Sequence, residues 1–140
     1  MSLMETHKLV ISNIRNDTPE AIVVTLRVPK VQRKRFAFKH GQYLTVKKMI
    51  EGVEIRRSYS ICSEASDAPE FLQVGIKKVE GGLFSSWAHS RLKIGDKLEV
   101  FLPDGQFTSA LSPSEAKTYC CVAVGSGITP ILSVMKTILC

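Results

Sequence analysis

The chain has 140 residues, 44% hydrophobic and 23% charged, an ordinary composition for one globular domain with a single sizeable core. No apolar run reaches the roughly 18 residues of a membrane-spanning helix, and the first residues lack the apolar stretch of a secretory signal. The sequence therefore argues against a helical membrane protein and predicts a cytoplasmic one.

The formal net charge of +6 raises nucleic acid as a ligand. However, the basic residues stand in short scattered groups at residues 33–35, 47–48, 56–57 and 77–78, without interleaved aromatic residues. This pattern favours solvated faces, and it also suits a basic rim that attracts an acidic protein or an anionic cofactor. The four cysteines show neither zinc-site nor iron–sulfur spacing, so no metal site is predicted.

Six short runs rich in β-branched and aromatic residues are predicted to be strands: residues 9–14, 21–28, 43–47, 53–61, 71–78 and 97–102. Glycine, proline, aspartate and asparagine turn signals separate them, which predicts a small antiparallel barrel or sandwich. Residues 83–91, LFSSWAHSR, break the alternation and predict one short helix. The pair Gly81-Gly82 precedes this helix, and glycines that open a helix suggest a phosphate-binding turn.

The predicted strand at residues 53–61 places an arginine on an apolar face. On an extended strand Val53, Ile55, Arg57, Tyr59 and Ile61 point to the same side. A guanidinium is unfavourable there unless the strand is near solvent, an internal carboxylate pairs with it, or an external anion does. The pattern alone leaves these three explanations open.

The character of the chain changes after ALSPSEAK. Residues 118–124, TYCCVAV, are typical of a strand buried in a parallel sheet, and GSGITP follows them. We then expect a helix with Thr129 as its N-cap and Pro130 as its first residue, because apolar residues recur at helical spacing.

One strand and one helix cannot build a parallel sheet by themselves. Residues 112–140 are therefore predicted to begin a second domain whose remainder is absent, after a first domain at residues 4–111. The alternative is a C-terminal helix that packs on the barrel.

Three motifs resemble those of the ferredoxin–NADP reductase superfamily and occur in the same order. Residues 57–60, RSYS, resemble its R-x-Y-[S/T] motif; residues 81–85, GGLFS, its G-G-x-x-S phosphate motif; and residues 125–130, GSGITP, its G-x-G-x-x-P turn. HGQYLTV is similar to the family's P-G-Q-Y strand, with His40 in place of proline, and IGDKLEVFLPDGQF to its G-D-x-L…P-x-G-x-F strand. Within the superfamily, the chain most resembles reductase components of bacterial oxygenases, such as those of phenylacetate degradation, and flavodoxin or ferredoxin reductases.

The resemblance implies a mainly β fold: a six-stranded antiparallel Greek-key barrel with one short helix that binds FAD. The first βα unit of an NAD(P)-binding α/β domain follows it. Arg57 would then face the FAD pyrophosphate, which answers the question of the missing anion. Tyr59 would lie against the isoalloxazine and Ser60 near the flavin N5, which gives these two residues the catalytic positions. Because Ser60 points to the other side of an ideal strand, a twist or bulge is expected there.

The resemblance also assigns the remaining cofactor contacts. Backbone N–H groups of residues 82–85 would converge on the pyrophosphate, and Thr129 would stand where the nicotinamide ring must stack on the flavin. The predicted cofactor-binding residues are Arg57, Tyr59, Ser60, Ile61, Gly75, Ile76, Lys77, Gly82, Leu83, Phe84, Ser85 and Thr129. Trp87 and His89 are predicted to be packing and surface residues of the short helix.

The implied function is that of an FAD-dependent reductase. It would pass electrons from NADH or NADPH through FAD to a one-electron acceptor, namely a ferredoxin, a flavodoxin or an oxygenase component. With an incomplete second domain we expect poor activity and self-association through that domain. A second hypothesis is a non-enzymatic basic β-barrel that binds nucleic acid or another anion.

Overall fold

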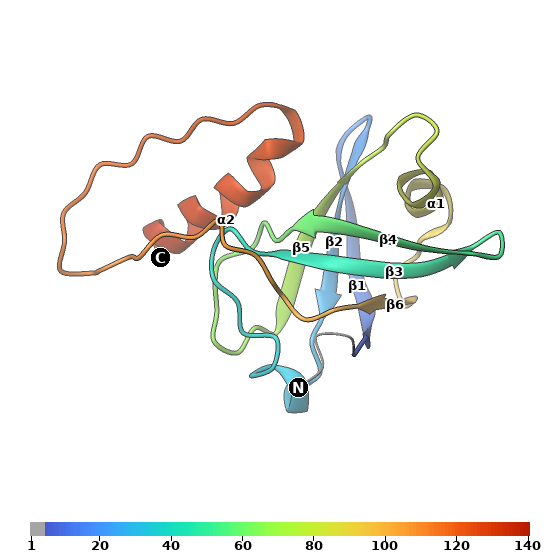
Figure 1. Ribbon diagram of the computed structural model, residues 1–140, viewed down its shortest axis with the longest axis horizontal. Helices are drawn as coiled ribbons and strands as arrows, with labels where there is room; N and C mark the ends of the chain where they lie inside the picture. The colour runs from blue at the N-terminus through green and yellow to red at the C-terminus, as the bar shows by residue number, and fades with distance from the viewer. Residues whose placement is uncertain (1–4) are drawn as a thin grey trace.

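The computed structural model describes residues 5–140 and contains six strands and two α-helices (Figure 1). The strands are β1 (His7–Thr18), β2 (Ala21–Arg27), β3 (Tyr43–Ile50), β4 (Val53–Ser60), β5 (Phe71–Lys77) and β6 (Lys97–Val100). The helices are α1 (Leu83–Arg91) and α2 (Ile128–Leu139), and two short 3-10 turns are η1 (Lys30–Gln32) and η2 (Gly125–Gly127). The six predicted strands and the predicted short helix are therefore confirmed, with small shifts at their ends.

The six strands form one antiparallel sheet in the order β4-β3-β6-β1-β2-β5. Strand β6 returns between the first two hairpins and pairs with both β1 and β3, which is the long-range crossing of a Greek key. The edge strands β4 and β5 approach one another at the bridge between Ile61 and Val74, where Cys62 N–H also donates to Gln73 O at 2.8 Å. The antiparallel six-stranded architecture is as predicted.

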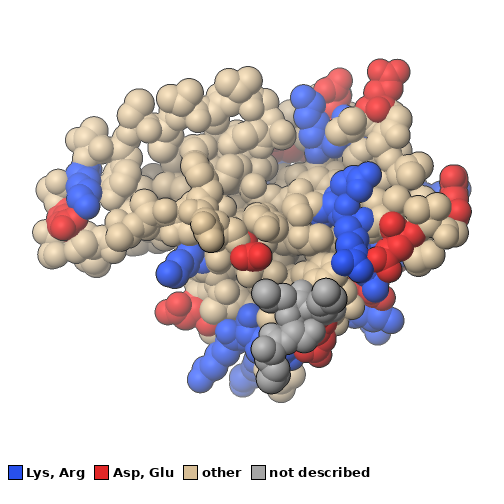
Figure 2. All heavy atoms as spheres, viewed as in Figure 1, with Lys and Arg blue, Asp and Glu red and all other residues tan. Residues whose placement is uncertain are grey.

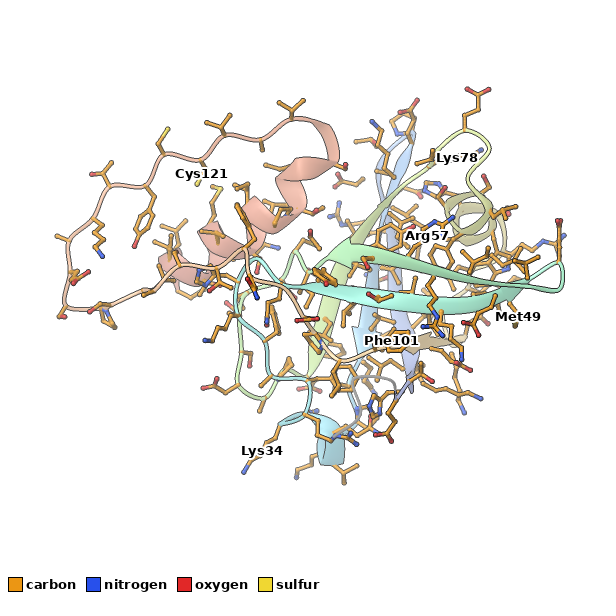
Figure 3. The ribbon with its side chains drawn as sticks, in the orientation of Figure 1. Lys34, Met49, Arg57, Lys78, Phe101 and Cys121 are labelled. Carbon is orange, nitrogen blue, oxygen red and sulfur yellow. The ribbon has the colours of Figure 1, made fainter. Side chains whose placement is uncertain are left out.

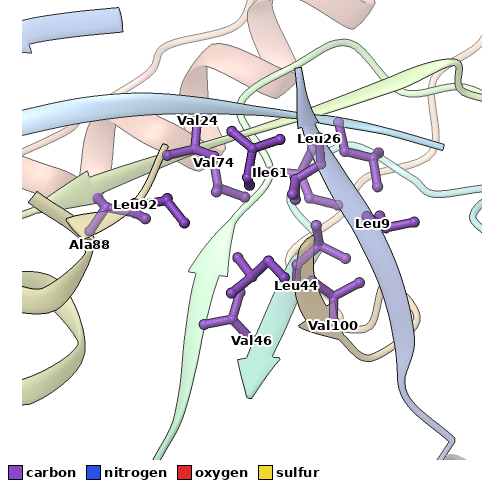
Figure 4. Close-up of a cluster of buried hydrophobic side chains, with 14 of the residues drawn as sticks. Leu9, Val24, Leu26, Leu44, Val46, Ile61, Val74, Ala88, Leu92 and Val100 are labelled. Carbon is purple, nitrogen blue, oxygen red and sulfur yellow. The ribbon is translucent and has the colours of Figure 1, made fainter. Parts of the chain in front are cut away.

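The core lies on one face of this sheet (Figure 4), and the alternation of core-facing and outward residues is clearest in β1, β5 and β6. In β1, for example, Leu9 and Ile11 are fully buried while Lys8 is exposed. Fully buried apolar side chains come from every strand or its end: Leu9, Val24, Leu26, Leu44, Val46, Ile61, Leu72, Val74, Ile76, Leu98 and Val100. All six strands therefore contribute to one apolar core.

Helix α1 covers one end of the sheet through Phe84 and Ala88, which are buried in the core. The ring of His89 makes a 2.9 Å hydrogen bond with the carbonyl oxygen of Ile76 and so attaches the helix to β5. The hairpin between β3 and β4 turns at Glu51 and Gly52, whose φ angles of 50° and 78° are those of a tight two-residue turn. Helix α1 contacts β3, β4 and β5.

The predicted strand at residues 118–124 is absent, and this prediction is wrong for the structure. Residues 105–124 run as an extended excursion without regular pairing (Figure 1), and Val122 and Val124 are 81% and 87% exposed. The apolar run is suited to burial between parallel strands. Among residues 5–140, however, no strand forms backbone hydrogen bonds with it.

Helix α2 forms as predicted, but it begins two residues before Pro130. Its N-cap is Gly127, and Thr129 lies in the first turn, where its hydroxyl donates to Ser126 O at 3.0 Å. The prediction that Thr129 is the N-cap is therefore wrong. The 3-10 turn at Gly125–Gly127 leads directly into α2, because the N–H of Ile128 already bonds the carbonyls of Gly125 and Ser126. The helix contacts the β domain through Lys136 and Thr137, which are hydrogen-bonded to Cys62 and Ala65.

His40, which replaces the family's usual proline, fastens the excursion to the barrel. The N–H of Ser109 donates to His40 Nε2 at 3.1 Å, and the imidazole is buried. The next residue, Gly41, has φ of +87°, and a Cβ there would lie 1.5 Å from Phe107 O, so no other residue fits. Burial and the neighbouring Lys39 lower the pKa of His40 from its ordinary value.

We expect this histidine to make the protein less stable in mild acid. Because its pKa is lower in the folded chain, the unfolded chain binds more protons near the ordinary pKa of 6.5, so the stabilisation present above that pH is lost below it. Urea unfolding at about pH 7.5 and about pH 5.5 tests this, with His40→Asn as the comparison. The variant should lose part of the pH dependence. An identical pH dependence in both chains would contradict the assignment.

Within residues 5–140, neither helix is long and apolar enough to cross a membrane. In the same range, no three His, Cys, Asp or Glu side chains gather in a way that could hold a metal ion.

Candidate functional site

Arg57 lies in β4 as an exposed cation without an acidic partner. Its guanidinium donates to the adjacent Arg56 carbonyl at 2.7 Å, and no carboxylate within residues 5–140 forms an ion pair with it. Figure 3 shows Arg57 on the side of β4 that faces α1. Of the three explanations for this arginine, the internal carboxylate is therefore ruled out among the described residues. Solvent and an external anion remain.

Arg56 next to it provides a contrast. Its guanidinium donates to Glu54 at 2.8 Å and lies over the ring of Phe101 at 5.2 Å. Consecutive residues of a strand point to opposite faces. Arg56 therefore lies on the face opposite Arg57, with its guanidinium over Phe101, the residue after β6 (Figure 3). Two neighbouring arginines thus lie on opposite faces of β4, and Arg56 is paired with a carboxylate of this chain whereas Arg57 is not.

The start of α1 is the second feature of the site. The N–H groups of Leu83, Phe84 and Ser85 have no acceptor among the residues that the structure describes, and no side chain caps this end. The first turn also holds no acidic residue, while His89 and Arg91 occupy the last turn. Three free donors and the positive end of the helix dipole favour an anion here.

The geometry of Gly82 differs in detail from the prediction. Its own N–H donates to Val79 O at 2.9 Å and is not free, so three of the four predicted N–H groups are available to a ligand. A Cβ on Gly82 would lie 2.7 Å from Ser85 Oγ and 3.0 Å from Val79 O. The buried hydroxyl of Ser85 accepts the N–H of Val79 at 3.1 Å, so its first task is to shape this turn.

Tyr59 connects β4 to α1. The half-buried ring packs against Phe84, with 5.8 Å between the ring centroids, and Phe84 in turn packs against Trp87 at 5.6 Å. Burial raises the pKa of the Tyr59 hydroxyl, so this ring stays neutral under ordinary conditions. A neutral aromatic ring beside an anion site suits contact with a flat ring system.

Several predicted contact residues offer only their backbone. The side chains of Ile61, Ile76 and Phe84 are in the core, with 0%, 0% and 1% of their surface exposed. The N–H of Ile61 donates to Gln42 O, and the carbonyl of Ile76 is held by His89. Side-chain contact from these three residues to a cofactor is therefore excluded by the packing of the barrel.

Ser60 ends β4 in regular register with β3, where it pairs with Tyr43. The pairing runs from Ile50–Val53 to Tyr43–Ser60 without a shift, so the bulge expected at Ser60 is absent from this ladder. The register irregularities lie in the β1–β2 pair instead. Ser60 is half-buried, adjacent in sequence to Tyr59.

The outer face of β5 carries Gly75 and the exposed Lys77 toward α2. A Cβ on Gly75 would lie 2.9 Å from Thr129 Cγ2, so the glycine is what lets Thr129 approach the strand. Beside this contact is a cavity of about 320 Å³ between the β1–β2 hairpin, β5 and α2. A second cleft, of about 580 Å³, runs along α1 past Gly82, Trp87 and the tip of the β3–β4 hairpin. The structure thus brings Gly75, Lys77 and Thr129 together in the first cavity and places Gly82 and Leu83 in the second, whereas Arg57, Tyr59 and Ser60 line neither.

Sequence reasoning missed the residues that hold these elements in place. His89 is expected at the surface from the sequence, yet its ring fixes α1 to β5. Lys48 lies over the Trp87 ring with 4.8 Å to the centroid. Both contacts join segments distant in sequence, and neither residue type carries a local pattern that would reveal its partner.

A free guanidinium on the strand face toward α1 and an uncapped start of that helix are groups that suit the diphosphate of a dinucleotide-type cofactor, and the fold supplies a β domain to hold it. Fold and site thus define the class of antiparallel β domains that bind such a cofactor. Residues 8–109 match the oxidoreductase FAD-binding domain family, and the chain belongs to that family. FAD is accordingly the cofactor that this domain is built to hold.

Curated relatives agree with the family. The chain is 37% identical over 133 residues to one of the subunits of 1,2-phenylacetyl-CoA epoxidase from Escherichia coli, covering 95% of this chain and 37% of that protein. It is 38% identical over 101 residues to the glycine betaine monooxygenase reductase subunit of Pseudomonas aeruginosa, covering 72% of this chain and 27% of that one. The chain therefore spans about a third of the length of these relatives.

Solved structures support the fold. Phthalate dioxygenase reductase, described as a modular structure for electron transfer from pyridine nucleotides to [2Fe-2S], is 27% identical with a TM-score of 0.79 over 96% of this chain and 40% of that one. A ferredoxin NADP+ reductase from Neisseria gonorrhoeae is 22% identical with a TM-score of 0.74, over 94% of this chain and 51% of that one, and shares the fold.

The comparisons do not support the alternative of a nucleic-acid-binding module. On the face in Figure 2, acidic groups lie among the basic ones, without one continuous basic stripe. Arg33 and Arg35, two members of the longest basic run, are paired with Glu70 and Glu5.

Proposed function

We propose that the chain is the FAD-binding part of a reductase that passes electrons from NADH or NADPH through FAD to a one-electron acceptor. The acceptor would be a ferredoxin, a flavodoxin or an oxygenase component, as the names of the relatives suggest. The observation that carries the proposal is the unpaired Arg57 on the side of β4 that faces α1, a helix whose start is uncapped, in a chain of the FAD-binding family. The cytoplasmic location stays a prediction.

The residues present fit FAD and have separable tasks. Arg57 and the N–H groups of Leu83, Phe84 and Ser85 would bind the pyrophosphate, and Gly82 keeps the turn free of a Cβ. When bound, FAD supplies the ring that accepts a hydride and releases single electrons.

The remaining residues would orient the flavin ring. Tyr59 would lie against it, held by Phe84, while Ser60 offers a hydroxyl and Gly75 and Lys77 line the other side.

We further propose that residues 112–140 are the beginning of an NAD(P)-binding domain, after the FAD-binding domain at residues 4–111. The relatives that this chain matches are about three times as long, which supports this division. Thr129 would then face the flavin from the nicotinamide side. Met135 and Leu139 of α2 are 42% and 80% exposed, which provides an apolar surface for the rest of that domain or for self-association.

Replacing Tyr59 with alanine tests the orientation of the flavin. An aromatic ring in contact with the isoalloxazine quenches its fluorescence, so the variant should bind FAD more weakly and fluoresce more strongly when fully loaded. We expect about 0.5 to 1.5 kcal/mol in affinity, the size of an aromatic pair. Fluorescence titration measures both quantities. Tyr119→Ala, in the exposed excursion, is the control, and unchanged fluorescence in Tyr59→Ala would contradict the stacking.

The proposed reaction is tested by anaerobic mixing. The 140-residue chain loaded with FAD is mixed with NADH or NADPH while the flavin absorbance at about 450 nm is followed. We expect bleaching faster than that of free FAD but slow, because residues that hold the dinucleotide are proposed to lie elsewhere. A rate no greater than that of free FAD with both nucleotides would contradict the reductase assignment, and complete bleaching within seconds would contradict the division into domains.

A further inference from the structure

Helix α2 is hydrogen-bonded to the β domain through a polar stripe. The stripe consists of Thr129, Ser133, Lys136, Thr137 and Cys140, which recur at the spacing of one helix face. Ser133 is the only buried residue in the helix, and nothing of its side chain is exposed. A helix of this length normally docks through large apolar residues. Here a small polar residue at the centre allows close approach.

The C-terminal half of the stripe is bonded to the loop that directly follows the R-x-Y-S segment. Lys136 Nζ donates to Cys62 O at 2.9 Å, and the N–H of Ala65 donates to Thr137 Oγ1, also at 2.9 Å. The Thr137 hydroxyl in turn donates to Ser133 O at 2.7 Å, which fixes its direction. Cys140 Sγ adds a 2.8 Å contact to Glu64. Each bond to the loop joins residues more than 70 positions apart.

The N-terminal half of the stripe has a different neighbour. Thr129, two helical turns earlier, lies against Gly75 on β5, so close that a Cβ at residue 75 would be 2.9 Å away. Cys62, which is buried, lines the same cavity as Gly75 and Thr129, and so does Lys136, which is exposed. A rigid helix bonded at one end to residues 62–65 therefore has its other end fixed over β5.

We propose that Lys136 and Thr137 are positioning residues: they latch α2 to the loop at residues 62–65 and thereby hold Thr129 over the flavin face at Gly75. This inference rests on the proposed function, in which that face carries the flavin. The latch joins the segment after Ser60 to the first helix of the proposed nucleotide-binding region. The spacing between flavin and nicotinamide would then depend on two hydrogen bonds made by residues that touch neither ligand.

The test uses the 140-residue chain with both latch bonds removed, Lys136→Met with Thr137→Val. These substitutions keep side-chain volume and helix formation while removing the donor and the acceptor. The matched control is Lys117→Met with Thr118→Val, the same pair of changes in the exposed excursion. Three quantities are measured: the alkylation rate of Cys62 followed on its own peptide by mass spectrometry, the dissociation constant for FAD, and acrylamide quenching of the bound flavin.

In the latch variant we expect Cys62 to be alkylated about tenfold faster or more, because local opening of α2 exposes the cavity that this thiol lines. Quenching of the bound flavin should rise about twofold, and the dissociation constant for FAD should stay within about twofold, because Arg57 and α1 are untouched. The control should match the original chain in all three measurements.

The outcomes separate the latch from the proposed function. Unchanged alkylation of Cys62 would overturn the latch while leaving FAD binding intact. Faster alkylation without greater flavin quenching would overturn the positioning role and show that the flavin does not lie beneath α2. A chain that binds no FAD before any substitution would overturn the proposed function itself, whereas the alkylation result would still report on the latch.

Discussion

Replacing Arg57 with alanine is expected to lower the affinity for FAD by about 1.5 to 3 kcal/mol, roughly 10- to 150-fold. The guanidinium has no acidic partner among residues 5–140, so its charge is available to the pyrophosphate and its loss leaves no buried anion behind. The barrel should therefore stay folded, with a free energy of unfolding unchanged within about 0.5 kcal/mol. Isothermal titration with FAD and urea unfolding measure the two quantities.

Arg56→Ala is the matched control, since it removes the same group one residue earlier on the opposite face. Arg56 pairs with Glu54 and lies over Phe101, so its loss should affect local stability and leave FAD binding nearly unchanged. If both variants lose FAD affinity equally, the effect comes from net charge and not from a direct contact. If Arg57→Ala unfolds instead, the arginine has a structural role that the geometry does not provide.

The second large effect is expected at Gly82. A Cβ added here would lie 2.7 Å from Ser85 Oγ, the end of a short buried side chain, and 3.0 Å from the backbone oxygen of Val79. Gly82→Ala should therefore displace Ser85 from the N–H of Val79, shift the start of α1 and weaken FAD binding by about tenfold or more, about 1.4 kcal/mol. Flavin titration and the amide exchange of residues 83–85 detect the two changes.

Gly127→Ala is a suitable control for this substitution. Gly127 is also the residue before a helix, with φ of −61°, and a Cβ there meets nothing within 4 Å. It should bind FAD like the original chain. Equal losses in the two variants would show that a glycine before a helix matters only for helix formation, against an anion site at α1.

Local patterns predict the strands and the short helix because the order of apolar and polar residues within each element indicates its secondary structure. Strand β1 shows why: Leu9 and Ile11 alternate with exposed residues, and that alternation is sufficient to place one face in the core. The apolar run at residues 118–124 shows the limit of the same reasoning. Its residues are suited to burial, but a strand also needs neighbours for its backbone, and these are not among residues 5–140.

A site residue can be predicted from the sequence where its chemical type and its position in a strand or turn already indicate its role. The alternation singles out Arg57 as an arginine on an apolar face, and the glycine pair marks the start of a helix; that Arg57 forms no ion pair among residues 5–140 is seen only in the structure. The side-chain burial of Ile61 and Ile76, the occupied N–H of Gly82 and the regular register at Ser60 depend on three-dimensional packing and are not visible in the sequence. The bonds of His89 and Lys136 to distant carbonyls have no sequence signal either.

The central claim is that this chain holds FAD through a pyrophosphate site, and the most direct measurement is the identity of the bound flavin. The purified chain is incubated with equal concentrations of FAD and FMN, freed of excess ligand, denatured, and the released flavin is identified by mass. FAD in large excess is the predicted result, because FMN lacks the diphosphate that Arg57 and the start of α1 would bind. Release of FMN and FAD in equal amounts, or of no flavin at all, would contradict the account.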